Sequence, residues 1–327
     1  NVESEALIAG NMGGIYAGGS VYLKGGITAG GGEIKAADDV YLLGSLNSWY
    51  GKIWAGDEVH DPWLQLSKVK VYEHCGANIP GFPLPKFPVV DKGSVWCNQV
   101  KSEALDKGHY FESKEEFLDS QIQWNPQLLQ LPWPFDDFYI VNTEPCMELS
   151  GIYFVDGPLV LNLVTLQQAY DRWKEVFREQ HPGEEIFQDD LAPSGFPEEI
   201  ADFVNNLLRP VVLEINVGEE GATIVADEIT IDESIEGIFG VNTLGINGPF
   251  GVFAVAGDVV YRALVGSDGR LSAISTGKFD CRTEGNLNLD WVAAKGDVVV
   301  DAIVDLNAAQ AAVPPGIPVG YQVVSWE

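Results

Sequence analysis

Acidic and aromatic side chains crowd one stretch near the start of the chain. The acids that could act in acid–base chemistry or bind calcium are Asp38, Asp39, Asp57, Glu58 and Asp61. The aromatics that could stack on sugar rings are Trp49, Tyr50, Trp54 and Trp63. Carbohydrate-active β-helical proteins need such paired carboxylates or calcium-binding acids. Large aromatics also pack under loops or against a neighbouring subunit, and the sequence favours this packing role.

The four histidines belong to no common catalytic motif. His60, His74, His109 and His181 lie neither in H-E-x-x-H nor beside a G-x-S-x-G turn. A hexapeptide-repeat acyltransferase, with His60 or His74 as base, is a minor alternative. The glycines at 30–32 lack the Lys-Ser/Thr of a phosphate-binding loop. We therefore predict no enzyme, with a carbohydrate-active enzyme as the alternative.

The cysteines are few and widely separated. They are Cys75, Cys97, Cys146 and Cys281. No C-x-x-C pair is present, so the spacing does not predict a zinc site. The even number predicts two disulfides in an oxidising compartment, with three pairings open. Four buried free thiols are the alternative.

The chain is strongly acidic. It has 48 acidic and 19 basic residues and a net charge of -29. Such a charge repels phosphate backbones and anionic lipids, so we predict no nucleic-acid partner. No apolar run reaches the length of about 18 residues that a membrane span needs. Together with the cysteines, this composition predicts an extracellular or cell-surface protein, whose leader or anchor we expect to lie outside this sequence.

Branched apolar residues recur at nearly every sixth position early in the chain. They are Ile15, Val21, Ile27, Ile34, Val40 and Leu46, with one extra residue near Glu33. This spacing fits neither a helix nor a hairpin, but it fits short parallel strands stacked in a β-solenoid. Glycines and Asp-Asp pairs between these positions suit sharp corners. An antiparallel sheet with glycine-rich turns is the alternative.

The same reasoning divides the whole chain into five parts. They are a first β-solenoid block (1–71), an irregular proline-rich segment with a short helix at a Ser113–Glu116 capping box (72–150), a solenoid strand (151–164), a pair of amphipathic helices starting from a Thr165 cap and from Pro197 (165–210), and a second β-solenoid block with a C-terminal tail (211–327). The turn sequence at 17–21 is echoed at 256–259 and 295–298. We therefore predict a mostly β fold, an interrupted parallel β-solenoid (β-helix) with a helical-pair insertion.

Three segments carry a family resemblance. The repeat at 15–21, the strand at 151–157 and the closing segment at 314–326 resemble the β-helical extracellular regions of PilX-like, type IV pilin-related bacterial surface proteins. The resemblance implies a surface-exposed structural role in a pilus or filament, without catalysis. The sequence differs from a pilin at its start, where the long apolar helix that packs a pilin into its filament is missing.

The ends of a solenoid expose unpaired backbone groups, which must be capped or paired with another subunit. The predicted assembly residues are Val2, Ala6, Leu7, Ile8, Tyr321, Val323, Val324 and Trp326. We predict an extracellular structural protein, minor pilin-like or adhesin-like, that associates with itself or with other pilus or surface subunits. The alternative is a polysaccharide-binding or polysaccharide-cleaving β-helix protein that contacts a surface glycan, with calcium as its candidate ion.

Overall fold

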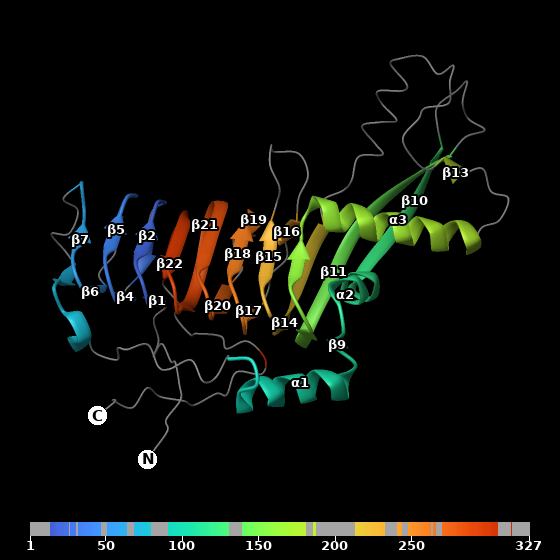
Figure 1. Ribbon diagram of the computed structural model, residues 1–327. Helices are drawn as coiled ribbons and strands as arrows, with labels where there is room; N and C mark the ends of the chain where they lie inside the picture. The colour runs from blue at the N-terminus through green and yellow to red at the C-terminus, as the bar shows by residue number, and fades with distance from the viewer. Residues whose placement is uncertain are drawn as a thin grey trace.

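The computed structural model describes residues 14–25, 27–30, 32–46, 51–63, 69–79, 91–130, 139–180, 186–187, 213–232, 241–243, 248–262, 264–265, 270–306 and 315. These residues form a mostly β protein with parallel sheets and three α-helices (Figure 1). Every strand pair is parallel except one, the antiparallel pair of β10 (Ile122–Gln130) and β11 (Tyr139–Val155).

Two long parallel ladders run along the molecule. The first ladder is, in spatial order, β8 (Lys70–Tyr72), β6 (Lys52–Ala55), β4 (Glu33–Ala36), β1 (Gly14–Ala17), β21 (Phe279–Ala294), β20 (Arg270–Ser275), β17 (Pro249–Ala254), β14 (Leu213–Ala226), β11 and β9 (Tyr110–Phe111). The second ladder is β7 (Val59–His60), β5 (Val40–Leu42), β2 (Val21–Leu23), β22 (Val298–Leu306), β21, β18 (Val259–Arg262), β15 (Ile229–Asp232) and β12 (Leu159–Leu161). Long strands such as β21 bend and contribute to both ladders.

Shorter pairs complete the strand arrangement. They are β3 (Ile27–Gly30) with β22, β16 (Val241–Thr243) with β14 and with β19 (Leu264–Val265), and β13 (Ile186–Phe187) with β11.

The six-residue spacing corresponds to one strand segment of a longer repeat. Ile15 pairs with Ile34, and Val21 pairs with Val40, each 19 residues further along the chain. All four side chains are fully buried, as the spacing predicts. Leu46 is partly buried against the same core, whereas the side chain of Ile27 lies outside the described residues. Stacking in register thus builds continuous apolar columns inside the molecule.

The order of the strands in space differs from their order in the chain. β1 lies between β4 and β21, so the first strands of the chain stack on the last ones (Figure 1). The backbone of Gly18 donates to Ala294 O, and Val298 N donates to Ser20 O. The echoed turn sequences at 17–21 and 295–298 are therefore neighbours in the stack, and one core runs through both blocks.

The predicted Asp-Gly corner joins β11 to β12. Gly157 has a φ of 107°, a conformation that side chains with a Cβ rarely adopt. Tyr153 and Val155 precede it and Leu159 and Leu161 follow it on the buried side. Residues 151–161 therefore have the predicted order of strand, corner and strand, and α3 (Leu163–Gln180) begins within the predicted segment 151–164.

Helix α3 begins earlier than predicted. The side chains of Asn162 and Thr165 accept hydrogen bonds from each other's backbone N–H, both at 3.0 Å. Asn162 therefore occupies the N-cap position and Thr165 lies inside the first turn, which corrects the predicted Thr165 cap. The helix starting from Pro197 lies outside the described residues.

Helix α2 (Lys114–Gln121) is the short helix predicted from the capping box. Ser113 Oγ accepts from Glu116 N at 3.2 Å, and Glu116 Oε2 accepts from Glu112 N at 2.7 Å. Together α2 and α3 cover one end of the strand stack. Phe117 and Leu118 of α2 and Leu166 of α3 belong to the main core. This end is called the capped end below.

Helix α1 (Val95–Lys107) lies on the outer side of the first ladder and was not predicted. Its buried residues Trp96, Val100 and Ala104 pack on outward-facing Phe253 and Ile274 in a second apolar cluster. This helix explains why the strands beneath it are apolar on both faces.

All four cysteines are free thiols, so the structure does not form the predicted disulfides. The four cysteines lie on separate elements. Cys75 precedes the short 3₁₀ helix η2 (Gly76–Asn78), Cys97 lies on α1, Cys146 on β11 and Cys281 on β21. Cys281 is fully buried in the main core, and this burial raises the pKa of its thiol.

Asp258 and Asp297 lie at the corner where the chain passes from one ladder to the other, and their carboxylates bind the backbone there. Asp258 Oδ1 accepts from Lys278 N at 2.8 Å, and Asp297 Oδ1 accepts from Ser20 N at 2.9 Å. Each carboxylate therefore satisfies a backbone donor of the next repeat, which strand pairing leaves unpaired at the corner. The Asp297 bond joins the last strands of the chain to the first.

Replacing Asp297 should test this corner. We expect Asp297→Ala to lower the free energy of unfolding by about 1 to 2 kcal/mol, because Ser20 N loses a charged acceptor. Urea unfolding followed by circular dichroism measures the loss. Asp106→Ala, which removes an exposed carboxylate on α1, is the matched control and should change stability by less than about 0.5 kcal/mol. Equal effects of the two variants would contradict the role of the corner.

Candidate interaction surface

The end of the stack opposite the capped end finishes in a strand edge. Among the described residues, β8 pairs with β6 and with no other strand. Lys70 is exposed, Val71 is half-buried and Tyr72 is 38% exposed. A parallel strand with one unpaired side offers backbone donors and acceptors to another strand. We call β7, β8 and the corner residues next to them the outer end.

The neighbouring β7 is protected by a side chain. Val59 N donates to Glu73 Oε1 at 2.8 Å, so this backbone donor is already satisfied. In the first ladder, His74 N, Cys75 N and Gly76 N donate to carbonyls of residues 55–57, which stacks the corner after β8 on the corner after β6. The exposed edge of the outer end is therefore mainly that of β8.

Three rings stack on the outward side of the second ladder at this end. Tyr22 and Tyr41 have ring centroids 4.7 Å apart, and Tyr41 and His60 have centroids 4.4 Å apart. The register of β2, β5 and β7 causes this stacking, because the three residues pair in line. Most ring faces are thus covered by other rings, and the ring edges remain to meet a ligand.

Asp39 lies at the centre of the polar contacts beside these rings. It accepts hydrogen bonds from Glu58 N at 3.0 Å and from Tyr41 Oη at 3.0 Å, and its carboxylate lies 3.7 Å from His60 Nε2. The bond from Glu58 N, followed by those from Tyr41 and His60, holds the pKa of Asp39 below its usual value. This predicted calcium ligand therefore acts on the backbone of the next repeat.

The lowered pKa of Asp39 predicts a pH dependence. A carboxylate with a depressed folded-state pKa stabilises the fold above its unfolded pKa of about 3.9 and loses this effect as the pH falls through the folded value. We expect wild type to be more stable than Asp39→Asn at pH 7, and the difference to shrink below about pH 4. Urea midpoints of both proteins between pH 7 and pH 3 measure it. A difference that stays constant over this range would refute the assignment.

The described members of the predicted aromatic platform, Trp54 and Trp63, have different surroundings. Trp54 stacks on Tyr72 with centroids 3.8 Å apart, so that face of the indole is covered. Trp63 is 68% exposed, and its backbone N–H donates to Asp61 Oδ1 at 3.2 Å. Trp49 and Tyr50 lie outside the described residues. Of the two predicted tryptophans that the structure describes, Trp63 is the more exposed.

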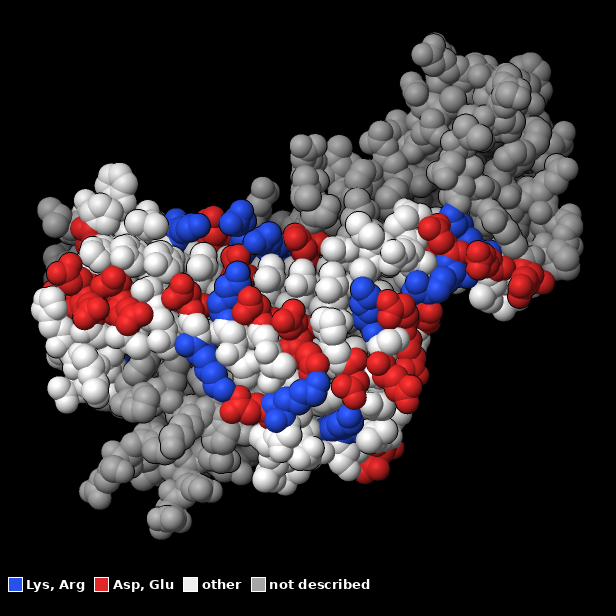
Figure 2. All heavy atoms as spheres, in the orientation of Figure 1, with Lys and Arg blue, Asp and Glu red and all other residues white. Residues whose placement is uncertain are grey.

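The other predicted acids lie along the corner next to the outer end. Asp38, Asp57 and Glu58 are exposed, and Asp61 is half-buried. Figure 2 shows acidic side chains gathered over this end of the molecule. Within the part of the chain that the structure describes, no three His, Cys, Asp or Glu side chains are grouped as metal ligands. The acids give this surface a strong negative charge.

The predicted assembly residues Val2, Ala6, Leu7, Ile8, Tyr321, Val323, Val324 and Trp326 lie outside the described residues. Of the C-terminal segment the structure describes Pro315, whose carbonyl accepts from Thr223 Oγ1 at 2.6 Å. The edge residues Lys70, Tyr72 and Glu73 were not predicted. Their signal in the sequence is the alternation of polar and apolar residues at 70–72, where the first block ends.

Comparison of the chain with protein-family models, curated proteins and solved structures finds no match. In the described residues, no helix has the length and apolar character that crossing a membrane requires.

Proposed function

We propose that the chain forms one interrupted parallel β-solenoid. The support is the constant register, in which Ile15, Ile34 and Ile53 follow one another at intervals of 19 residues and are all fully buried. The stacking of β1 on β21 makes the two blocks one body rather than two domains. The helical insertion predicted at 165–210 then has α3 as its first helix.

We further propose that this solenoid is an extracellular structural subunit, pilus-associated or filament-associated, that acts through its surfaces and not by catalysis. The observation that supports it best is the difference between the two ends. Phe117, Leu118 and Leu166 close the capped end, whereas β8 leaves a strand edge at the outer end. A scaffold with an uncovered strand edge at one end of its described residues can join an assembly by strand pairing.

The capped end favours a particular place in such an assembly. Growth of a filament by end-to-end stacking needs two complementary ends, and helices cover one of them here. A subunit with one free end is suited to a terminal or accessory position, as in a minor pilin-like or adhesin-like protein. The surface charge of the molecule suits exposure to solvent.

Immunogold electron microscopy of the source cells tests this function. Antibodies raised against the purified chain should label surface filaments on intact cells. A strain that lacks the gene is the control for specificity. Labelling only after the cells are opened, or labelling of the surface away from any filament, would refute the pilus-associated role.

A polysaccharide-binding role is the second candidate, and the exposure of Trp63 favours it. An exposed indole next to Asp61 offers an apolar face and a hydrogen-bond acceptor, which sugar recognition uses. On a glycan array, wild type should retain some neutral or cationic glycans, which the acidic surface does not repel. Trp63→Ala should lose them. Exposed Leu105→Ala on α1 is the control. The absence of any retained glycan for wild type would refute this role.

A further inference from the structure

We propose that the β8 edge is a self-association site, where two copies of the chain pair β8 with β8 in antiparallel orientation about a two-fold axis. This proposal rests on the assembly role proposed above and names the partner as a second copy. It adds one pairing to a ladder that is otherwise parallel.

The faces of β8 determine the register of such a pair. Val71 follows Ile53 in the inward column, whereas Tyr72 stacks on Trp54 on the outward side. Residues directly opposite in an antiparallel pair point to the same side, and a shift by one residue would turn one copy inside out. Inward Val71 must therefore face an inward residue of the other copy.

Of the registers that keep inward residues opposite each other, one gives favourable side-chain pairs at all three positions of β8. Pairing Val71 with Val71 of the second copy continues the apolar column from one solenoid into the other. It also places Lys70 opposite Tyr72 of the second copy, twice by symmetry, where an ammonium group can interact with an aromatic ring. The shift that pairs Lys70 with Lys70 brings like charges together, and the shift that pairs Tyr72 with Tyr72 places Val71 opposite Glu73.

The charges around the edge favour the antiparallel orientation. The strand starts at exposed Lys70, which lies beside Lys52 in register, while Lys52 itself pairs with Glu33 at 3.4 Å. It ends next to an acidic corner with Glu73, Asp57 and Glu58. An antiparallel pair places each Lys70 against the acidic corner of the other copy. A parallel pair would place like charges together, which is unfavourable for a chain of this net charge.

The partial burial of Val71 also supports a second copy of the chain as the partner of β8. The residues that precede it in the inward column, Ile15, Ile34 and Ile53, are fully buried between neighbouring strands. Val71 has a neighbour on one side within the described strands. A second copy would complete its burial and pair with the side of β8 that faces no other described strand.

Sedimentation velocity over a concentration series tests the proposal on the full chain. Wild type should show a reversible monomer–dimer equilibrium. Lys70→Glu and Glu73→Lys should each raise the dissociation constant about tenfold, because like charges then meet across the axis. The double variant Lys70→Glu with Glu73→Lys should bind more tightly than either single variant, because the corners carry opposite charges again, but more weakly than wild type, because the Lys70–Tyr72 contact stays lost. Lys107→Glu on α1 is the matched control and should leave the equilibrium unchanged.

The double variant separates pairing from folding. Glu73→Lys also removes the acceptor of Val59 N, and this loss persists in the double variant, so a purely structural effect would not be rescued. A wild type that is monomeric at all concentrations, single variants without effect, or a double variant that fails to recover would each overturn the proposal. Immunogold labelling of surface filaments does not depend on these outcomes, so the proposed function fails or stands separately.

A cross-link provides a second measurement. In a Cys75→Ser background, Val71→Cys should form a disulfide-linked dimer on mild oxidation, because the two-fold axis places the two residues 71 opposite each other within disulfide range. Asn98→Cys, on the exposed side of α1, is the control for random cross-linking. Equal yields of dimer from both variants would contradict the register.

Discussion

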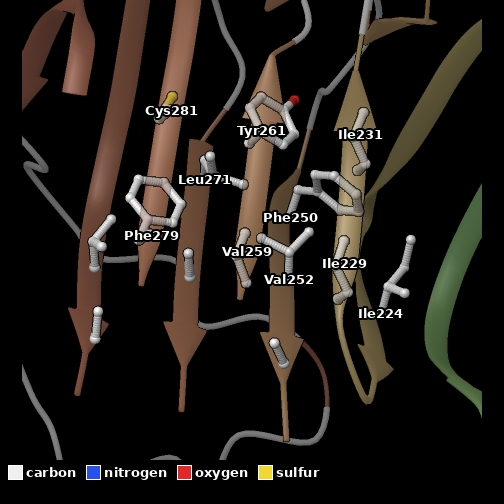
Figure 3. Close-up of a cluster of buried hydrophobic side chains, with 14 of the residues drawn as sticks. Ile224, Ile229, Ile231, Phe250, Val252, Val259, Tyr261, Leu271, Phe279 and Cys281 are labelled. Atoms are coloured by element: carbon white, nitrogen blue, oxygen red, sulfur yellow. The ribbon is translucent and has the colours of Figure 1, made fainter. Parts of the chain in front are cut away.

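Phe279→Ala should lower the free energy of unfolding by about 3 to 5 kcal/mol, the range expected when a fully buried phenylalanine is truncated. Phe279 is fully buried on β21 and faces the interior, where it pairs with Val259 on one side and Val298 on the other (Figure 3). Backbone ladders hold both neighbouring strands, so the cavity cannot close by moving one of them. Such a loss approaches the whole stability of many domains.

Urea unfolding followed by near-ultraviolet and far-ultraviolet circular dichroism measures this effect. Phe279→Leu keeps most of the volume and should cost less than about 1.5 kcal/mol. Trp63→Ala removes a larger but exposed ring and should change stability by less than about 0.5 kcal/mol. A loss below 1 kcal/mol for Phe279→Ala would contradict a densely packed interior at β21.

The inward residues were predictable because each carries its signal locally. A branched residue such as Ile15 or Val40 in the centre of a short strand, between glycines or aspartates, needs no knowledge of its neighbours in space. The parallel arrangement followed from the same spacing. The chain therefore encodes its strand segments residue by residue.

The order of stacking was not predictable from that spacing. Every repeat presents a similar inward column, so Ile15 could pair with any other repeat as well as with Ile34 and Val292. The position of β1 between β4 and β21 depends on packing across the whole chain. The echo between 17–21 and 295–298 was visible in the sequence, but it indicates likeness and not adjacency.

Helix α1 was missed although its boundaries carry ordinary signals. Ser94 accepts from Cys97 N at the start, and Gly108 has a φ of 75° at the end. Its apolar stripe is narrow, with Trp96, Val100 and Ala104 spaced by four residues, and it follows a proline-rich segment that suggested irregular structure. The stripe is narrow because a flat sheet face needs only one row of contacts.

The sequence pointed to acids at turns but did not show what these acids do. Asp39 and Asp297 were visible in the sequence as acids at turns. Their role as hydrogen-bond acceptors is seen only in the structure, where Glu58 N and Ser20 N of the next repeat donate to them. Such bonds join residues 19 or 277 positions apart. The sequence therefore suggested Asp39 as a calcium ligand, whereas contacts between repeats show that Asp39 and Asp297 accept hydrogen bonds from the backbone.

Gly56→Ala should destabilise the fold by about 3 kcal/mol, at the upper end of the usual cost of overpacking. A Cβ at Gly56 would lie 1.6 Å from the carbonyl oxygen of Ala37 and 2.6 Å from its carbonyl carbon. Relief requires the backbone to move, but Gly56 N already donates to Ala36 O at 3.0 Å and Asp57 N donates to Asp38 O. One methyl group would therefore separate two repeats at the corner, and the hydrogen bonds on both sides would weaken.

Gly218→Ala is the matched control, because a Cβ there meets no atom within 4 Å. We expect it to change stability by less than about 0.5 kcal/mol, since both variants add the same methyl group and reduce the freedom of the unfolded chain alike. Differential scanning calorimetry of the two proteins compares them directly. A similar transition temperature for both would mean that the corner at Gly56 can open, and the tight stacking of repeats between β4 and β6 would then be wrong. If Gly56→Ala alone lowers the transition temperature, the close approach of successive corners limits these positions to glycine.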